Sequence, residues 1–371
     1  MLNKVQTEDN FRDLKESPIY NISLCSLENF HTNFWKWLGN NYPERFLKIF
    51  KGILELSDED YQTIKVEECN DQVSFGKEAR PDLTIKLSSP QMNIFIENKL
   101  KSFPTDNQLE KYTEVVNEKC KDSNNKFILL SLAGKNVLPS DWAYMGYSEL
   151  ASKMEELFVN FYNDYHKYLI KDYINVIKKL SEEFERAIKN CNSKYDFYKE
   201  KRLNEIRLRD IYVKYCGQEL GNFIRNNLPE GVNLGVGFNN KKATIHLSKD
   251  LGDGFYIGIQ IEGDQYRYYM IIPGCNQQER IEIASKFSEQ ELWFNLANKN
   301  NSRMRELKKN DVENNCFCHY EPDFIYRYSN LDLLFDKELH LITYDEISDK
   351  IVEDFNSIEI NWQKICEIIK K

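Results

Sequence analysis

The chain has 371 residues, of which 41% are hydrophobic, 13% aromatic and 29% charged, and its formal net charge is −9. This composition is typical of a folded protein, since disordered chains lack the aromatic side chains that offset the entropy of ordering. The length predicts two domains, each large enough for its own core. The acidic charge argues weakly against a protein coated in nucleic acid, because phosphate binding depends on lysine and arginine, but it leaves room for a local basic groove.

The sequence carries no sign of export or of a membrane segment. No stretch approaches the run of about 20 apolar residues that spans a bilayer, and charges are spread from Met1 to Tyr20, unlike in a signal peptide. We therefore expect a cytoplasmic protein with no membrane partner. The nine cysteines are scattered, so reduced thiols are expected. Cys316-Phe-Cys318-His319 resembles a ligand cluster but lacks a second pair at the spacing of a zinc site.

Two helices are predicted near the N-terminus. Ser26 is a suitable N-cap, Glu28 falls in the first turn where the helix dipole favours a carboxylate, and Phe34 and Trp37 belong to an apolar stripe at helical spacing. A second helix is predicted to begin at Pro43, because proline is favoured at the first helical position.

The pattern then changes to alternation, which is typical of strands. Residues 61–68 and 72–75 alternate loosely and are predicted to pair with each other. Residues 82–87 and 93–99 alternate better and are separated by turn residues, so they are predicted to form a hairpin.

A crossover unit follows the hairpin. The pattern is helical from Thr105, and residues 126–132 form a short apolar run of the kind found in buried strands. A strand, a helix and a further strand place the helix over one face of the sheet. The order of elements is therefore that of an α/β protein.

The C-terminal half is predicted to be an antiparallel α+β region. Two long helical patterns reach residue 226 or so, and four alternating runs follow, separated by turns that contain asparagine, aspartate or glycine. The runs are residues 232–238, 243–247, 255–262 and 266–272. The last predicted helices are residues 279–297, 345–355 and 360–369.

Three charged residues stand at the ends of the predicted hairpin strands. Asp82 begins one strand, and Glu97 and Lys99 end its partner on one face, so antiparallel pairing brings them together. Two converging carboxylates suit Mg²⁺, which takes one or two protein carboxylates plus substrate phosphate. Phosphodiester hydrolysis uses such a metal to polarise the phosphoryl oxygen and activate water, and a cation to stabilise the attacking group. An ordinary ion pair is the alternative for a lone Glu-x-Lys.

These residues resemble a known family. Arg80-Pro81-Asp82, Glu97-Asn98-Lys99 and Gln108-x-x-x-Tyr112 are similar to motifs of the PD-(D/E)xK nuclease superfamily, over about residues 20 to 150. The resemblance implies a restriction-endonuclease-like αβββαβ core in residues 1–155. Residues 156–371 would then be a helical connection and an α+β domain for substrate, partner or dimer contacts.

The resemblance also implies roles for single residues. Asp82 and Glu97 would be metal ligands, together with Glu28 and the main-chain carbonyl of Asn98. Lys99 would position or activate the attacking water. A structural role for Glu28 is the alternative, because a first-turn glutamate is common for capping reasons.

Four further residues complete the predicted site. Gln108 and Tyr112, one helical turn apart, would reach the site from the crossover helix, unless they only pack there. Arg80 and Lys101 would contact the nucleic acid.

The function implied by the resemblance is Mg²⁺-dependent endonuclease cleavage of DNA, with Mn²⁺ as a substitute metal, in bacterial restriction or phage defence. The sequence leaves RNA open as a substrate. Cutting both strands of a duplex needs two sites, which a homodimer would supply. The alternatives are a catalytically silent nuclease fold that binds nucleic acid or protein, and a non-nuclease scaffold whose aromatic helices bind a protein.

Overall fold

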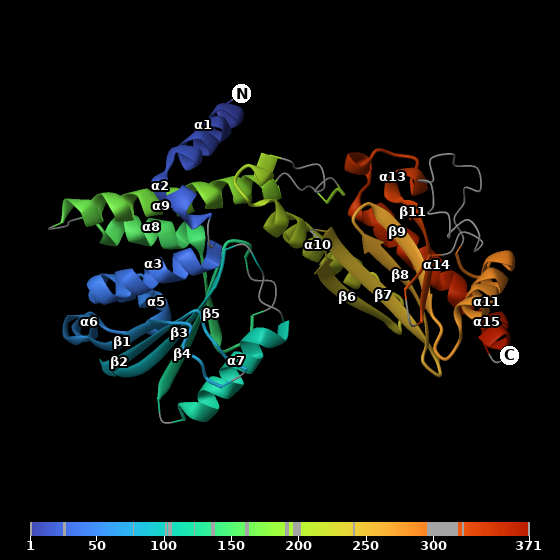
Figure 1. Cartoon of the computed structure of the whole chain (residues 1–371), viewed down its shortest axis with the longest axis horizontal. Helices are drawn as coiled ribbons and strands as arrows, with labels where there is room; N and C mark the ends of the chain where they lie inside the picture. Colours follow the sequence, from blue (N-terminus) through green and yellow to red (C-terminus); the bar gives the residue numbers. More distant parts are fainter. Residues whose placement is uncertain are drawn as a thin grey trace. The chain divides into compact units, whose positions relative to one another are not determined.

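The computed structural model describes residues 2–24, 27–76, 78–100, 102, 106–121, 123–134, 138–159, 163–189, 193–195, 202–239, 242–294, 318–320 and 323–369. The chain forms two compact units. Unit 1 comprises Met1–Ile188 and Arg202–Ile211, and unit 2 comprises Lys189–Lys201 and Tyr212–Lys371. Each unit has one sheet with helices, so the fold is mixed α/β (Figure 1).

Unit 1 contains a five-stranded sheet in the order β1-β2-β3-β4-β5. The first three strands are antiparallel, whereas β3, β4 and β5 run parallel. The strands are β1 (Lys65–Asp71), β2 (Leu83–Ser89), β3 (Gln91–Lys99), β4 (Asn124–Ser131) and β5 (Trp142–Gly146). The predicted hairpin is present as β2 and β3, and the predicted buried strand is present as β4.

Helix α7 (Asp106–Lys119) connects β3 to β4 and covers one face of this sheet (Figure 1). Its buried Leu109 and Val116 pack in a core with Phe95 of β3 and Phe127 of β4, whose rings are 5.3 Å apart. Because side chains alternate along β3, the face that carries Phe95 also carries Glu97 and Lys99.

The opposite face of the sheet is covered by α3 (Leu27–Asn41) and α8 (Tyr147–Leu157), and α9 (Asp164–Lys189) packs against α3 (Figure 1). The buried rings of Phe34 and Tyr173 stack at 3.8 Å between α3 and α9. His31 is buried as well, and its Nδ1 lies 2.8 Å from the Tyr173 hydroxyl. His31 therefore has a packing role between α3 and α9.

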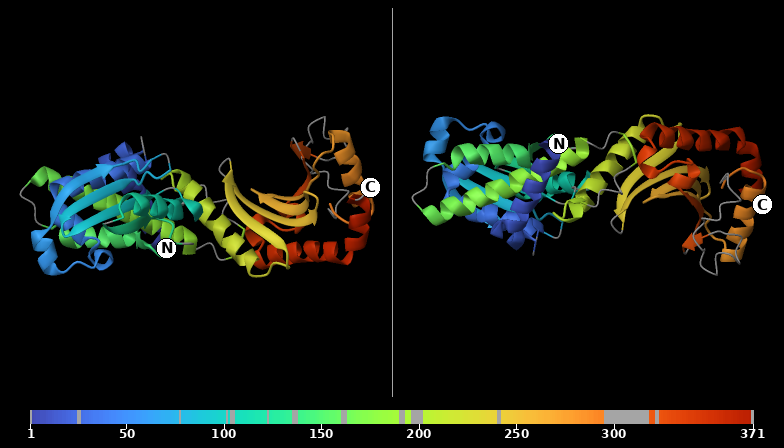
Figure 2. Two further views of the ribbon diagram at one scale, coloured as in Figure 1. Left: turned by 90° about the horizontal axis from the view of Figure 1, so that it is seen from below. Right: turned by 90° about the horizontal axis from the view of Figure 1, so that it is seen from above.

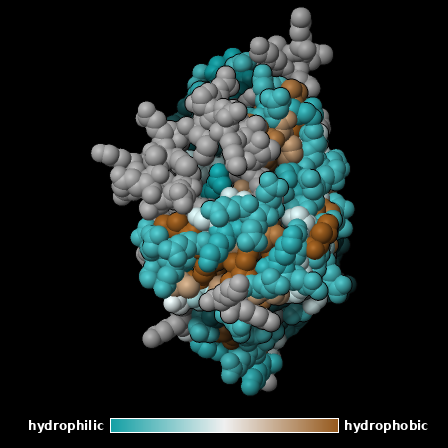
Figure 3. Space-filling view, turned by 90° about the vertical axis from the view of Figure 1, so that its right-hand side faces the viewer, coloured by the Kyte–Doolittle hydropathy of each residue, from teal (hydrophilic) through white to brown (hydrophobic). Residues whose placement is uncertain are grey.

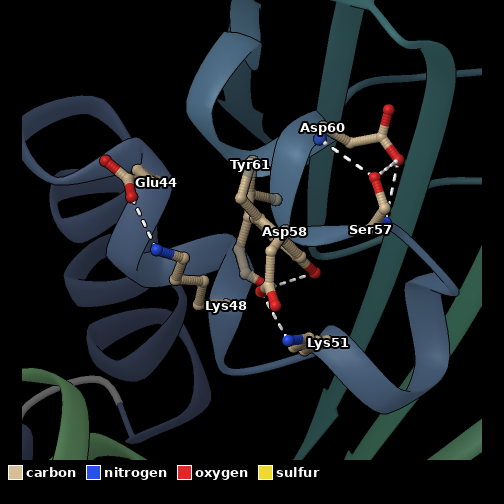
Figure 4. Close-up of polar contacts among 8 residues, drawn as sticks. Glu44, Lys48, Lys51, Ser57, Asp58, Asp60 and Tyr61 are labelled. Carbon is tan, nitrogen blue, oxygen red and sulfur yellow. Dashed lines mark hydrogen bonds and ion pairs between the residues drawn. The ribbon is translucent and has the colours of Figure 1, made fainter.

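The predicted pairing of residues 61–68 with 72–75 is wrong. Tyr61 lies in α6 (Asp58–Thr63), where Ser57 and Asp60 form a capping box, and residues 72–75 contain no strand. Only β1 forms, and it pairs with β2 instead. The capping box, drawn in Figure 4, satisfies N–H groups at the helix start and so favours helix over strand.

The helix predicted from Pro43 is present as two short helices, α4 (Pro43–Lys48) and α5 (Lys51–Leu54). Ion pairs support this region in Figure 4: Lys48 Nζ lies 2.6 Å from the Glu44 carboxylate, and Lys51 Nζ lies 2.5 Å from that of Asp58. Besides α6, three further helices and strands of unit 1 were not predicted. They are α1 (Leu2–Glu16), α2 (Pro18–Ser23) and β5.

Unit 2 contains a six-stranded antiparallel sheet in the order β10-β11-β9-β8-β7-β6. The four predicted strands are confirmed, and β10 and β11 are additions. The strands are β6 (Val232–Asn239), β7 (Lys242–Gly252), β8 (Phe255–Glu262), β9 (Gln265–Ile271), β10 (Cys318–Tyr320) and β11 (Phe324–Asn330). Cys316, part of the cysteine cluster, lies outside the described residues.

Helices α10 (Arg209–Arg225) and α14 (Tyr344–Ile360) run along one face of this sheet (Figure 2). The buried carboxylate of Asp354 on α14 accepts hydrogen bonds from the hydroxyls of Tyr266 and Tyr268 on β9, at 2.8 and 2.9 Å. These bonds satisfy a carboxylate that would otherwise be costly to bury.

The remaining helices of unit 2 only partly match the prediction. They are α11 (Gln277–Glu289), α13 (Leu331–Leu334) and α15 (Trp362–Ile369), with short 3₁₀ turns at Leu339–Leu341 in unit 2 and Arg202–Asn204 in unit 1. Figure 3 shows hydrophilic side chains around smaller hydrophobic areas on the face of unit 2 that it displays. Among the helices of the described ranges, none has both the length and the apolar character needed to cross a bilayer.

Candidate active site

A buried pair of opposite charges lies at the C-terminal end of β3. The Lys99 Nζ is 2.7 Å from Glu97 Oε1, and the two side chains are 12% and 3% exposed. Both point to the sheet face covered by α7. This pair is unlike the other ion pairs of unit 1, most of which are exposed, because a buried pair must recover a large desolvation cost.

Asp82 joins this pair from the neighbouring strand. The register of β2 and β3 places Leu83 opposite Ile96, so Asp82 stands beside Glu97. The Asp82 Oδ2 accepts a hydrogen bond of 2.8 Å from the main-chain N–H of Asn98. The structure thus brings together Asp82, Glu97 and Lys99, as the hairpin spacing predicts.

The charges of these three residues are not balanced. Burial raises the pKa of Glu97, and the nearby charge of Asp82 raises it further, although Lys99 opposes both effects. Burial also raises the pKa of Asp82. Burial alone would lower the pKa of Lys99, but Glu97 and Asp82 outweigh it and the pKa is raised. Among the described residues, the Lys99 ammonium therefore lies beside two carboxylates, the buried Glu97 and the half-buried Asp82, and the site favours an additional positive charge.

Glu97 also has an unused oxygen. Its Oε2 is buried and has no hydrogen-bond partner among the described residues. Such an atom is costly to bury unless a ligand satisfies it. Two adjacent carboxylates with an open oxygen are the hard donors that Mg²⁺ prefers, so the side chains present fit a divalent cation.

The described residues contain no cluster of three His, Cys, Asp or Glu side chains that could hold a metal ion. Glu28 nevertheless lies near the site, because its charge acts on Asp82 and Lys99, and its Oε1 accepts a hydrogen bond of 2.6 Å from the Ser102 hydroxyl.

Gln108 and Tyr112 both lie at this site, on α7. The Gln108 Nε2 donates to Glu97 Oε1 at 3.0 Å and to the Tyr112 hydroxyl at 3.1 Å. Tyr112 donates to the main-chain oxygen of Arg80 at 3.4 Å. This arrangement holds one oxygen of Glu97 in place and leaves the other open.

The structure describes one of the two predicted nucleic-acid contacts, Arg80. The Arg80 side chain is exposed, and its Nε donates to the main-chain oxygen of Gln72 at 3.0 Å. Arg80 immediately precedes the Pro81-Asp82 pair, so it lies at the edge of the site. Lys101 lies outside the described residues.

The sequence analysis missed the side chain of Asn98 and its partner Tyr147. The hydroxyl of Tyr147 donates a hydrogen bond to Asn98 Oδ1, and both residues are buried. Tyr147 is the first residue of α8, far along the chain from β3. No local pattern predicts this contact, because it depends on how α8 packs on the sheet.

Comparison with known proteins identifies the family. A model of the PD-(D/E)XK nuclease superfamily matches residues 18–210, more than half of the 371 residues of the chain. The chain therefore belongs to the PD-(D/E)XK nuclease superfamily, as its motifs suggest. No curated protein and no solved structure matches the chain.

Proposed function

We propose that unit 1 is a Mg²⁺-dependent endonuclease that hydrolyses DNA, with the restriction-endonuclease-like core expected of its family. The observation that carries this proposal is the buried Glu97 carboxylate, which has an open Oε2, a second carboxylate beside it and, among the described residues, Lys99 as the cation near both. Replacing a buried ion pair by apolar side chains of similar volume is often neutral or stabilising, so stability alone gives no reason for these charges, and they support a chemical role.

The protein residues divide the work. Asp82 and Glu97 would hold the cation, with the main-chain carbonyl of Asn98 as a further ligand. When bound, the cation supplies Lewis-acid polarisation of the phosphoryl oxygen and lowers the pKa of water. Lys99 stabilises negative charge on the attacking oxygen, since its ammonium is fixed beside Glu97. Gln108 keeps Glu97 oriented through its other oxygen.

The wider setting of this proposal rests on the family. DNA as the substrate and a role in restriction or phage defence follow from the motifs, and a homodimer would supply the two sites that duplex cleavage needs. We assign the nuclease core to residues 1–155, and the remainder to contacts with substrate, a partner or a second copy. A silent nuclease fold is disfavoured, because a binding module has no physical need for converging buried carboxylates.

A cleavage panel tests the proposal. Wild type is incubated with supercoiled plasmid, single-stranded DNA and RNA, in Mg²⁺, in Mn²⁺ and in EDTA, beside Asp82→Ala and Lys99→Ala. We expect metal-dependent cleavage of DNA by wild type and none by either variant, and Lys86→Ala is the control because Lys86 is 53% exposed on the same strand pair. Full activity in either site variant would refute the site assignment, and cleavage of RNA alone would correct the substrate.

A further inference from the structure

The side chain of Asn98 faces away from the carboxylates of the candidate active site. Asn98 lies between Glu97 and Lys99 on β3, so strand alternation directs its amide to the opposite face of the sheet, under α3 and α8. The residue is 1% exposed. A buried amide on a core face is costly compared with an apolar side chain, so its partners need an explanation.

Three hydrogen bonds meet at Asn98. The Tyr147 hydroxyl donates to its Oδ1, and its Nδ2 donates to the main-chain oxygen of Glu28 at 3.4 Å. Its main-chain N–H donates to Asp82 Oδ2 at 2.8 Å. A single residue thus connects β3 to α8, to the first turn of α3 and to the carboxylate of Asp82.

These contacts fix the peptide that the proposed metal site uses. The N–H of Asn98 orients Asp82, and its carbonyl is the proposed main-chain ligand. If the amide turned about its side-chain torsions, the strand end would lose its links to both helices. Removing a residue that orients a metal ligand typically lowers the metal affinity by roughly 10- to 100-fold.

We propose that Tyr147 and Asn98 are positioning residues, which set the orientation of the Glu97-Asn98-Lys99 segment for metal binding through the hydrogen bond between their side chains. This inference rests on the proposed function. Tyr147 lies on the face of the sheet opposite the carboxylates, and the hydrogen bond to Asn98 links it to the Glu97-Asn98-Lys99 segment. Burial raises the pKa of the Tyr147 hydroxyl, so it stays a neutral donor.

The test is a calorimetric titration of the full-length protein with Mg²⁺. Tyr147→Phe keeps the ring and removes only the hydroxyl, so we expect a Kd about 10- to 100-fold higher than that of wild type. Asn98→Leu replaces the amide by a side chain of similar size without polar atoms, and we expect its Mg²⁺ Kd to rise at least as much. Circular dichroism of each variant without metal verifies the fold.

Tyr173→Phe is the matched control. Tyr173 is also fully buried, but its hydroxyl bonds to the side chain of His31, whereas the hydroxyl of Tyr147 bonds to Asn98. Removing it should lower thermal stability in a similar way and leave the Mg²⁺ Kd unchanged, because a merely structural loss does not move that constant.

The outcomes separate this inference from the proposed function. Mg²⁺ binding by wild type with an equal Kd in folded Tyr147→Phe and Asn98→Leu would overturn the positioning role and leave the proposed function standing. An equal rise of the Kd in Tyr173→Phe would also overturn it, since the effect would then be general loosening. No Mg²⁺ binding by wild type would overturn both.

Discussion

At the scale of single residues, the site consists of charges that the fold holds at a cost. Glu97 and Lys99 are buried together, and Asp82 adds a second carboxylate, which among the described residues shares the Lys99 ammonium with Glu97. The sequence was sufficient to predict this trio, because strand alternation and the hairpin spacing are local properties. The sequence also predicted that Gln108 approaches the site, where it bonds to Glu97. It did not predict the hydrogen bond between Tyr147 and Asn98, because that contact depends on tertiary packing.

Gln108 offers a prediction at this scale. Gln108→Ala removes the donor to Glu97 Oε1, so the carboxylate loses its orientation, and we expect Mg²⁺-dependent cleavage to fall by about 10- to 100-fold. The measurement is the initial rate of plasmid nicking. Glu114→Ala, an exposed position on the same helix, is the control and should keep the wild-type rate. A wild-type rate in Gln108→Ala would show that the helix only packs here.

At the scale of elements, local patterns predicted the strands with clear alternation and failed where two patterns competed. Strands β6 to β9 alternate and are bounded by short polar turns, and all four are present. Residues 61–68 alternate only loosely. Their first residues, 61–63, belong to helix α6, which the capping box stabilises. The short strand β5 was missed because its pairing with β4 is non-local.

Close packing of α10 on the sheet gives an element-scale prediction. A Cβ at Gly221 would lie 2.3 Å from Val236 Cγ2, and the stiff valine on β6 cannot move aside without cost. Overpacking costs about 1–3 kcal/mol, which exceeds or offsets the gain in helix propensity of about 1 kcal/mol. We expect Gly221→Ala to speed amide hydrogen exchange in β6 and β7.

Gly235→Ala is the control for this prediction, because nothing lies within 4 Å of a Cβ at that position on β6. Exchange in β6 and β7 should then stay close to that of wild type. Slower exchange in Gly221→Ala than in wild type would mean that α10 has room to accommodate the methyl group, contrary to the geometry.

At the scale of the whole molecule, the length of the chain predicts two domains, and the structure has two compact units. All candidate site residues that the structure describes belong to unit 1, and the family match ends at residue 210, close to the end of that unit. Helix α9 belongs to unit 1 as well, although the sequence analysis treats everything after residue 155 as connection and second domain. The helical pattern alone does not show which core a helix joins.

The central claim is that the buried carboxylate of Glu97 serves metal-dependent cleavage. Glu97→Gln tests it most directly, because it keeps the size of the side chain and removes its charge, while Asp82 remains near Lys99 as a counter-charge. The measurement is the initial rate of Mg²⁺-dependent cleavage of supercoiled plasmid, with Glu110→Gln, exposed on α7, as the control. We predict a rate at least about 100-fold below that of wild type in Glu97→Gln and an unchanged rate in the control. A folded Glu97→Gln protein that cleaves at the wild-type rate would contradict the account.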